Sequence, residues 1–264
     1  MVGLPVRRAP NRALAAVFAL ALGCFAGTLR AAPAAPPRDR ITVDDPSWHL
    51  ESSSDGISLY SGTVPEARVV PVKAVMTIPG TIADVALVLE DISRRGDWIS
   101  NFEQSVLLER PNDYDQIEYL RVDLPWPASD RTAIVRVRVT VSDDLHRATI
   151  AGESVESHLA DRLPKLVRAQ VHTSTFQMTQ AGGQVEVVAL VFIDPSGWVP
   201  KWIVNYFTRR GARTTLSGLR RQVARRLYSP TQVTAMQRRI EGYKVFSQRG
   251  AALGGGADRG AATP

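Results

Sequence analysis

The sequence predicts an α+β fold in which a curved antiparallel β-sheet wraps around a long C-terminal α-helix. The middle of the chain contains successive strand-like runs joined by short turns, and short connections are typical of antiparallel neighbours. After residue 199 the apolar residues change to helical spacing. A sheet bent around one helix leaves an interior volume, so we expect an internal cavity as the candidate site.

The N-terminal residues 1–34 are interpreted as a signal peptide. Three arginines precede an apolar run from Ala13 to Ala26, which is shorter than the ~20 residues that a membrane span needs. Small-x-small patterns predict cleavage after Ala26 or Ala34, and the chain is then periplasmic or secreted. The alternatives are an uncleaved amphipathic anchor that associates with the membrane, and lipidation at Cys24, where the preceding residues form a poor lipobox.

The charge is unevenly distributed. The formal net charge of +6 falls to +2 when the four arginines of residues 1–34 are removed, so part of the basicity belongs to the predicted signal peptide. Residues 201–249 hold twelve Lys and Arg against the single acid Glu241. Cys24 is the only cysteine, so a chain without residues 1–34 can form neither a disulfide nor a thiolate metal site.

The first part of the domain reads as two strands and a helix. Residues 35–46 are rich in proline and charge and are expected to form a linker. Strands are predicted at Ile57–Tyr60 and Val69–Thr77. Thr81 is expected to cap a helix, because apolar residues recur at helical spacing after it, and this helix ends near residues 93–96.

Strands then alternate with turns until the final helices. The predicted strands are Ser105–Leu108, Ile117–Leu124, Ala133–Val141, Arg147–Ala151, Val167–Met178 and Val185–Ile193. The final helix presents Ala212, Leu216, Leu219, Val223 and Leu227 on one face. Residues 229–248 are expected to form a helical extension, and residues 249–264 a disordered tail.

Three segments resemble the START lipid-transfer family, a branch of the helix-grip superfamily. They are the run from Pro125 to Arg131 (PWPASDR), the run Leu166–Ala169 (LVRA) and the run from Asp194 to Asn205 (DPSGWVPKWIVN), and Trp98 lies where that family tends to carry a tryptophan. Thr132 stands where the family usually has an Asp after the arginine. The resemblance implies a helix-grip fold over residues 47–228.

The resemblance also implies a function. It predicts a monomeric lipid-binding or lipid-transfer protein that holds one hydrophobic ligand, such as a sterol, hopanoid, phospholipid or fatty acyl lipid, in an internal cavity without a cofactor. The same superfamily includes polyketide aromatase/cyclases, so a cyclase-like enzyme is the alternative. Fold alone does not separate the two, whereas export favours the binding protein.

Strand alternation predicts the residues that line the cavity, because residues two apart share one face. The expected ligand-binding residues are Glu118, Leu120, Val122, Trp126, Val135, Val137, Arg168, Ile203 and Phe207. Glu118 would be the one carboxylate among apolar neighbours, where it meets a ligand hydroxyl or pairs with an arginine such as Arg168. Alternatively the facing is reversed and Glu118 is exposed. In sterol-type members an arginine stands where this chain has Val137, which argues against cholesterol. For Trp126 the alternative is ordinary packing.

The sequence contains no catalytic or metal-binding motif that we recognise. The four histidines have no ligand spacing, and His-Glu-x-x-His, Gly-x-Ser-x-Gly and phosphate-loop patterns do not occur. The arginines of the final helix suggest docking on an anionic membrane surface, or else a solvated helix face that balances the acidic remainder. Nucleic-acid binding is not expected, because no recognition motif accompanies them.

Overall fold

The computed structural model describes residues 41–67, 69–158, 164, 166–200, 203 and 210–254, and gives the backbone alone for residues 244–254. The predicted signal peptide of residues 1–34 lies outside the described residues, and so does Phe207.

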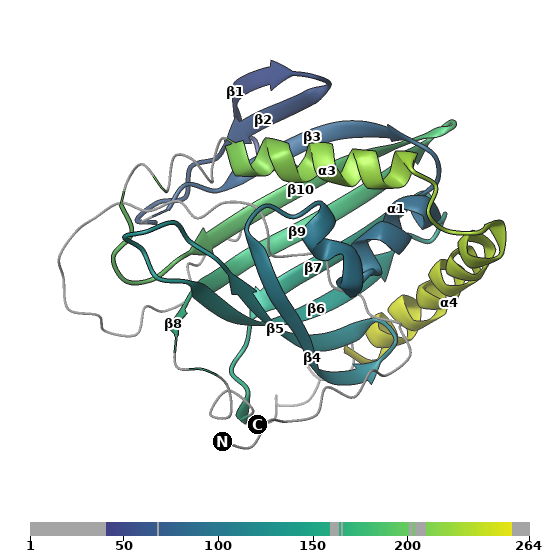
Figure 1. Ribbon diagram of the computed structural model, residues 1–264. Coiled ribbons are helices and arrows are strands. Elements are labelled where there is room, and N and C mark those ends of the chain that lie inside the picture. Colours follow the sequence, from purple (N-terminus) through teal and green to yellow (C-terminus); the bar gives the residue numbers. More distant parts are fainter. Residues whose placement is uncertain are drawn as a thin grey trace, which may run out of the picture.

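Ten strands within the described residues form one sheet (Figure 1). Their order across the sheet is β1-β2-β3-β10-β9-β7-β6-β5-β4, and β8 pairs with β6 beside this path. The strands are β1 (His49–Ser54), β2 (Ile57–Ser61), β3 (Val72–Pro79), β4 (Phe102–Asn112), β5 (Asp115–Val122), β6 (Arg131–Val141), β7 (Arg147–Ser154), β8 (Val167–Arg168), β9 (Gln170–Ala181) and β10 (Gln184–Asp194). Neighbours pair antiparallel except β6 and β8, which are parallel.

Two strands differ from the sequence prediction. β1 was not predicted, because all six of its residues are exposed and it carries no alternation of apolar and polar residues. The predicted strand Val167–Met178 is divided at Ala169 into β8 and β9, which pair with different neighbours. The α+β class with a large antiparallel sheet is confirmed.

The described helices are α1 (Ile82–Glu90), the 3-10 helix η1 (Ile92–Asp97), α3 (Ala212–Ala224) and α4 (Pro230–Gly254). The predicted cap at Thr81 is confirmed, because its hydroxyl accepts from the Asp84 backbone N–H while the Asp84 carboxylate accepts from the Thr81 N–H. Figure 1 shows α3 running across one face of the sheet. Four residues of its predicted apolar face are buried, whereas Leu227 lies beyond the end of α3 and is 38% exposed.

The main core lies between the inner face of the sheet and the helices α1, α3 and α4. A second, smaller cluster covers the outer face of β10, where Ile41 and Val69 pack against Leu190 and Phe192. The expected linker of residues 35–46 is therefore wrong for its second half, because residues 41–46 contribute Ile41 and Val43 to this cluster. Residues 35–40 lie outside the described part of the chain.

The C-terminal helix is longer than the sequence predicted. α4 runs to Gly254, so the first residues of the expected disordered tail 249–264 are helical, and residues 255–264 lie outside the described part. Met236, Ile240 and Tyr243 of α4 join the main core. Arg239 pairs with Glu90 at 2.8 Å and ties α4 to α1. The residues that follow the family-like region thus belong to the same packed unit.

Candidate functional site

The inner faces of β5 and β6 carry the predicted apolar lining. Leu120, Val122, Val135 and Val137 are all buried in the main core, and so is Ile203 near the start of the C-terminal helical region. The strand alternation predicted from the sequence is confirmed for these two strands.

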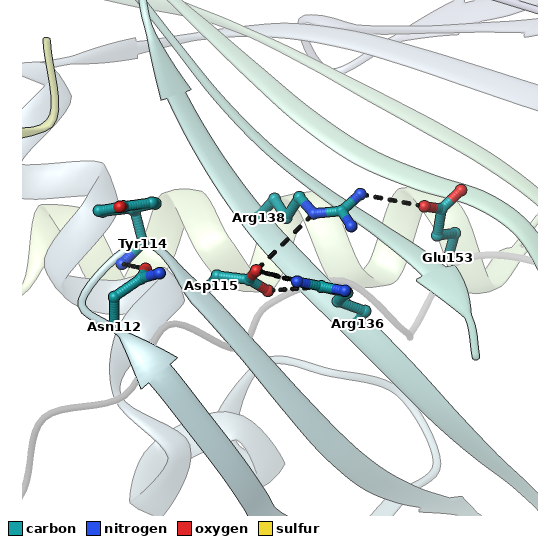
Figure 2. Close-up of polar contacts among 6 residues, drawn as sticks. All are labelled: Asn112, Tyr114, Asp115, Arg136, Arg138 and Glu153. Carbon is teal, nitrogen blue, oxygen red and sulfur yellow. Dashed lines mark hydrogen bonds and ion pairs between the residues drawn. The ribbon is translucent and has the colours of Figure 1, made fainter. Parts of the chain in front are cut away.

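The opposite face of the same strands is charged, which fixes the direction of the alternation (Figure 2). Arg136 and Arg138 of β6 point outward, where Asp115 of β5 accepts hydrogen bonds from Arg136 Nε at 2.8 Å and from its Nη2. Arg138 donates to Glu153 of β7 at 3.2 Å. Because successive residues of a strand point to opposite faces, Val135 and Val137 point inward.

Glu118 lies on the inner face and is 1% exposed. Its Oε2 accepts hydrogen bonds from Arg95 Nη1 at 3.0 Å and from Ser105 Oγ at 3.0 Å, and its Oε1 accepts one from the Gln116 amide. Burial raises the pKa of Glu118, while the Arg95 charge and these donors oppose the rise. The four residues Arg95, Ser105, Gln116 and Glu118 are called the buried polar cluster below.

Arg95 is the partner of Glu118, and it belongs to η1, just after α1. Its side chain is 1% exposed, and burial lowers its pKa against the attraction of Glu118. Arg168, which the sequence offered as the internal partner, is exposed on β8 and does not fill that role. Sequence reasoning missed Arg95 because it lies beside Arg94 at the predicted end of a helix, where periodicity does not separate a buried arginine from a solvated one.

Several polar atoms in the interior have no protein partner among the described residues. Arg95 uses only Nη1, so its Nε and Nη2 donors are buried without an acceptor. Trp98 Nε1 and Ser174 Oγ are likewise buried without a hydrogen-bond partner. Buried polar groups are nearly always hydrogen-bonded in folded proteins, because leaving one unpaired costs ~1–3 kcal/mol.

These atoms share the inner side of the sheet. Ser174 and Phe176 are two apart on β9, and Phe176 contacts the Trp98 ring edge-on at 6.5 Å between centroids. Ser174 is also connected to the buried polar cluster through one row of the sheet, because it pairs with Gly152, Gly152 with Val137, and Val137 with Gln116. A line of small and medium side chains therefore runs from Ser174 to the charged pair.

Trp98 is held in place by a close approach of α3. A Cβ on Gly218 would lie 2.6 Å from the Trp98 carbonyl oxygen, so α3 can pack here only because residue 218 is glycine. The glycine that weakens the helix by propensity thus allows η1, and with it Arg95, to lie against α3.

Two arginines of α3 donate hydrogen bonds to backbone oxygens of a neighbouring hairpin. Arg213 donates to the Ser54 backbone oxygen at 2.7 Å, and Arg220 donates to the Asp55 oxygen at 2.8 Å. Both therefore hold the turn of the β1–β2 hairpin. Arg221, Arg225 and Arg226 are exposed near the end of the helix, while Arg209 lies outside the described residues.

The other predicted site residue, Trp126, is 87% exposed in the loop between β5 and β6, so it is not packed against the apolar lining. The alternative of ordinary packing for Trp126 is also wrong, because its ring lies in solvent.

Within the described residues no three His, Cys, Asp or Glu side chains are placed to hold a metal ion. None of the helices described is long and apolar enough to cross a bilayer.

A family profile for the START domain matches residues 37–226. The chain belongs to the START domain family. The matched region contains every candidate ligand-binding residue and ends before α4, so α4 lies outside the matched region.

Relatives and solved structures agree with this assignment. An uncharacterized protein of Pseudomonas aeruginosa is 26% identical over 184 residues, which is 68% of this chain and 88% of that protein. The phosphatidylcholine transfer protein of Mus musculus is 23% identical over 180 residues, 65% of this chain and 81% of that one. Human StAR-related lipid transfer protein 5 superposes with a TM-score of 0.63 at 18% identity, covering 69% of this chain and 89% of its own. A STAR-related lipid transfer protein fragment from Xanthomonas axonopodis gives 0.58 at 23% identity, covering 67% and 99%.

Proposed function

We propose that this START domain binds one lipid between the inner face of its sheet and α3, and carries or presents that lipid without chemically changing it. The observation that carries the proposal is Arg95, a fully buried arginine whose two donor nitrogens Nε and Nη2 have no acceptor among the described protein atoms. A ligand oxygen would satisfy these donors, and apolar chains would lie against the surrounding valines and leucines.

The lining is suited to an apolar molecule with one polar end. Every inward residue of β6 from Ala133 to Val141 is apolar, and on the neighbouring strand β5 the inward residues Gln116 and Glu118 belong to the buried polar cluster. Removing apolar surface from water contributes ~25 cal/mol per Å², so the acyl or ring portion would supply most of the affinity. The polar cluster would select the head of the molecule and orient it.

A glycerophospholipid is the ligand class that we propose first. Arg95 already neutralises Glu118, so its free donors are suited to an acceptor such as an ester carbonyl or a phosphodiester oxygen. Three relatives at 21–23% identity are named phosphatidylcholine transfer proteins, which supports the same class. Sterols, hopanoids and fatty acyl lipids are the other members of the panel to be tested.

We further propose that the protein acts outside the cytoplasm as a periplasmic or secreted monomer. The support is the run of Arg7, Arg8 and Arg12 followed by an apolar stretch to Ala26. Export would place the lipid-binding domain beside membrane surfaces, which are the source of its ligand.

Native mass spectrometry with organic extraction tests the proposed function. The protein purified from cells is expected to carry one equivalent of lipid, and the extract identifies its class. Purified protein that carries no lipid and takes up none from a panel of phospholipids, sterols and fatty acids would contradict the proposal.

The role of Arg95 is tested with Arg95→Lys. Lysine keeps the positive charge beside Glu118 but removes the planar guanidinium and its two free donors, so we expect the domain to fold while lipid affinity falls about tenfold or more. Arg94→Gln is the matched control, because Arg94 is the adjacent arginine and its side chain is 47% exposed. Equal affinity of Arg95→Lys and wild type across the panel would show that Arg95 does not contact the ligand.

A further inference from the structure

Arg95 contacts Glu118 through only one of its three side-chain nitrogens. Arginine–carboxylate pairs are frequently bidentate, with two parallel N–H···O bonds. Here Arg95 Nη1 donates to Glu118 Oε2 at 3.0 Å and to the Ser105 hydroxyl at 2.9 Å, while Nε and Nη2 have no acceptor among the described residues. The second carboxylate oxygen, Oε1, therefore takes its hydrogen bond from a different side chain.

Gln116 supplies that hydrogen bond. Its side chain is buried beside Glu118 on the inner face of β5, and its amide Nε2 donates to Glu118 Oε1. Because this bond occupies Oε1, Glu118 does not need a second donor from Arg95. An amide turned by half a rotation would instead point its own oxygen at the carboxylate, where the two acceptors repel each other. The orientation of Gln116 thus decides whether Arg95 keeps two free donors.

Arg110 of β4 fixes the orientation of Gln116. Its Nη2 donates to Gln116 Oε1 at 2.8 Å. A guanidinium has donors only, so the amide oxygen faces Arg110 and the amide nitrogen faces Glu118. The hydrogen bonds therefore run in one direction, from Arg110 through Gln116 to Glu118.

No acid draws Arg110 away from this position. Within the part of the chain that the structure describes, Arg110 forms no ion pair with a carboxylate. Glu90 attracts it from a longer distance, but both Glu90 oxygens accept hydrogen bonds from Arg239 of α4, at 2.8 and 3.1 Å. Around Glu118 two arginines, Arg95 and Arg110, thus stand against one carboxylate. This excess of positive charge favours a ligand whose polar end carries an anionic group.

We propose that Arg110 is a positioning residue for the lipid: it orients the Gln116 amide, which satisfies Glu118, and so leaves Nε and Nη2 of Arg95 to a phosphate oxygen of the ligand. The inference rests on the proposed function and adds the residue that keeps the polar end of the site available. Without Arg110 the Gln116 amide is free to turn, and Glu118 Oε1 takes its donor from Arg95 in a bidentate pair. The ligand then loses its donors although Arg95 is still present.

Competition between two lipids with the same acyl chains tests the role of Arg110. The full chain is incubated with an equimolar mixture of dioleoylphosphatidylcholine and dioleoylglycerol, and native mass spectrometry gives the ratio of the two lipids bound. Wild type is expected to prefer the phospholipid. Arg110→Leu should lower the ratio about tenfold or more, because hydrogen bonds to a charged group are lost. Each ratio is taken within one sample, so a partly unfolded fraction does not change it.

Three further variants separate positioning from direct contact with the ligand. Arg110→Lys keeps a cationic donor for Gln116 Oε1 and should retain the wild-type ratio within about threefold. Gln116→Leu should lower the ratio as much as Arg110→Leu, and the double variant should lower it no further, because residues that act in series are not additive. Arg138→Leu is the matched control, since Arg138 is 49% exposed on the outer face of β6, and should leave the ratio unchanged.

The outcomes distinguish this proposal from the proposed function. An unchanged ratio in Arg110→Leu would overturn it, and so would losses that multiply in the double variant, because Arg110 would then contact the ligand itself. Failure of Arg110→Lys to keep the preference would overturn it as well. Wild type that binds both lipids equally would contradict the positioning role and leave lipid binding intact, whereas wild type that binds neither lipid would contradict the proposed function.

Discussion

Glu118 accepts hydrogen bonds from three side chains, on η1, β4 and β5, and this arrangement makes a buried carboxylate tolerable. The residue that completes it, Arg95, is left with donors of its own. A purely structural ion pair would satisfy both partners, since burying two charges is repaid only with good geometry and additional hydrogen bonds. The hydrogen bonds of Glu118 are thus made, whereas two donor nitrogens of Arg95 are left without an acceptor. This difference is the feature of the site that most favours a ligand.

Glu90 provides a prediction about pH. Burial raises the pKa of Glu90 from 4.5 to about 7, against the attraction of Arg239. The folded protein binds this proton more tightly than the unfolded chain, so the contribution of Glu90 to stability is present below pH 4.5 and is lost as pH rises through 7. Between pH 5 and pH 8 the unfolding free energy of wild type should therefore fall by more than that of Glu90→Gln, and the difference should be about 3 kcal/mol or less.

Urea denaturation at the two pH values measures the effect of Glu90. Glu156→Gln, which changes an exposed carboxylate, is the matched control and should keep the wild-type pH dependence. A Glu90→Gln variant whose stability falls with pH as steeply as that of wild type would show that Glu90 is ionised in the folded protein at pH 5.

At the scale of elements, Gly218 decides how closely α3 approaches η1. Gly218→Ala places a methyl group 2.6 Å from the Trp98 carbonyl oxygen, where backbone, and not a flexible side chain, must move. We expect a loss of about 1–3 kcal/mol in unfolding free energy, measured by chemical denaturation, together with weaker lipid binding as η1 shifts.

Gly242 of α4 is the matched control for Gly218. No atom lies within 4 Å of its Cβ position, so Gly242→Ala should stabilise the protein by about 0.5–1 kcal/mol through helix propensity alone. If both substitutions stabilised the protein, the close contact between α3 and Trp98 would be excluded.

Elements with strong local patterns could be predicted from the sequence. The capped helix after Thr81 and the alternating strand from Ala133 to Val141 could be predicted, because a helix cap and period-two burial are local signals. β1 could not be predicted, since its pairing with β2 is made by backbone bonds from exposed residues. The inward facing of Glu118 followed from alternation, whereas its partner Arg95 depends on how η1 packs across the chain, which no local pattern reports.

At the scale of the whole molecule, α4 packs on the same core as the matched region. It follows the matched region 37–226, yet Met236, Ile240 and Tyr243 join the same core as α3. Tyr243 also donates to the Asp113 oxygen at 3.0 Å in the β4–β5 turn, so the helix connects α1 to the far edge of the sheet. The domain and its extension should therefore unfold together.

Met236→Ala tests that cooperativity. Met236 is 2% exposed, and truncating a buried methionine costs about 2–4 kcal/mol. If α4 belongs to one folding unit, the variant must lower the denaturation midpoint equally by far-UV circular dichroism, which reports all helices, and by tryptophan fluorescence, which includes the buried Trp98. Gln237→Ala, its exposed neighbour, should change neither. An early circular dichroism transition with an unmoved fluorescence midpoint would instead show that α4 melts independently. Glu90, whose partner Arg239 lies on α4, would then titrate exposed to solvent at denaturant concentrations well below those that unfold the domain.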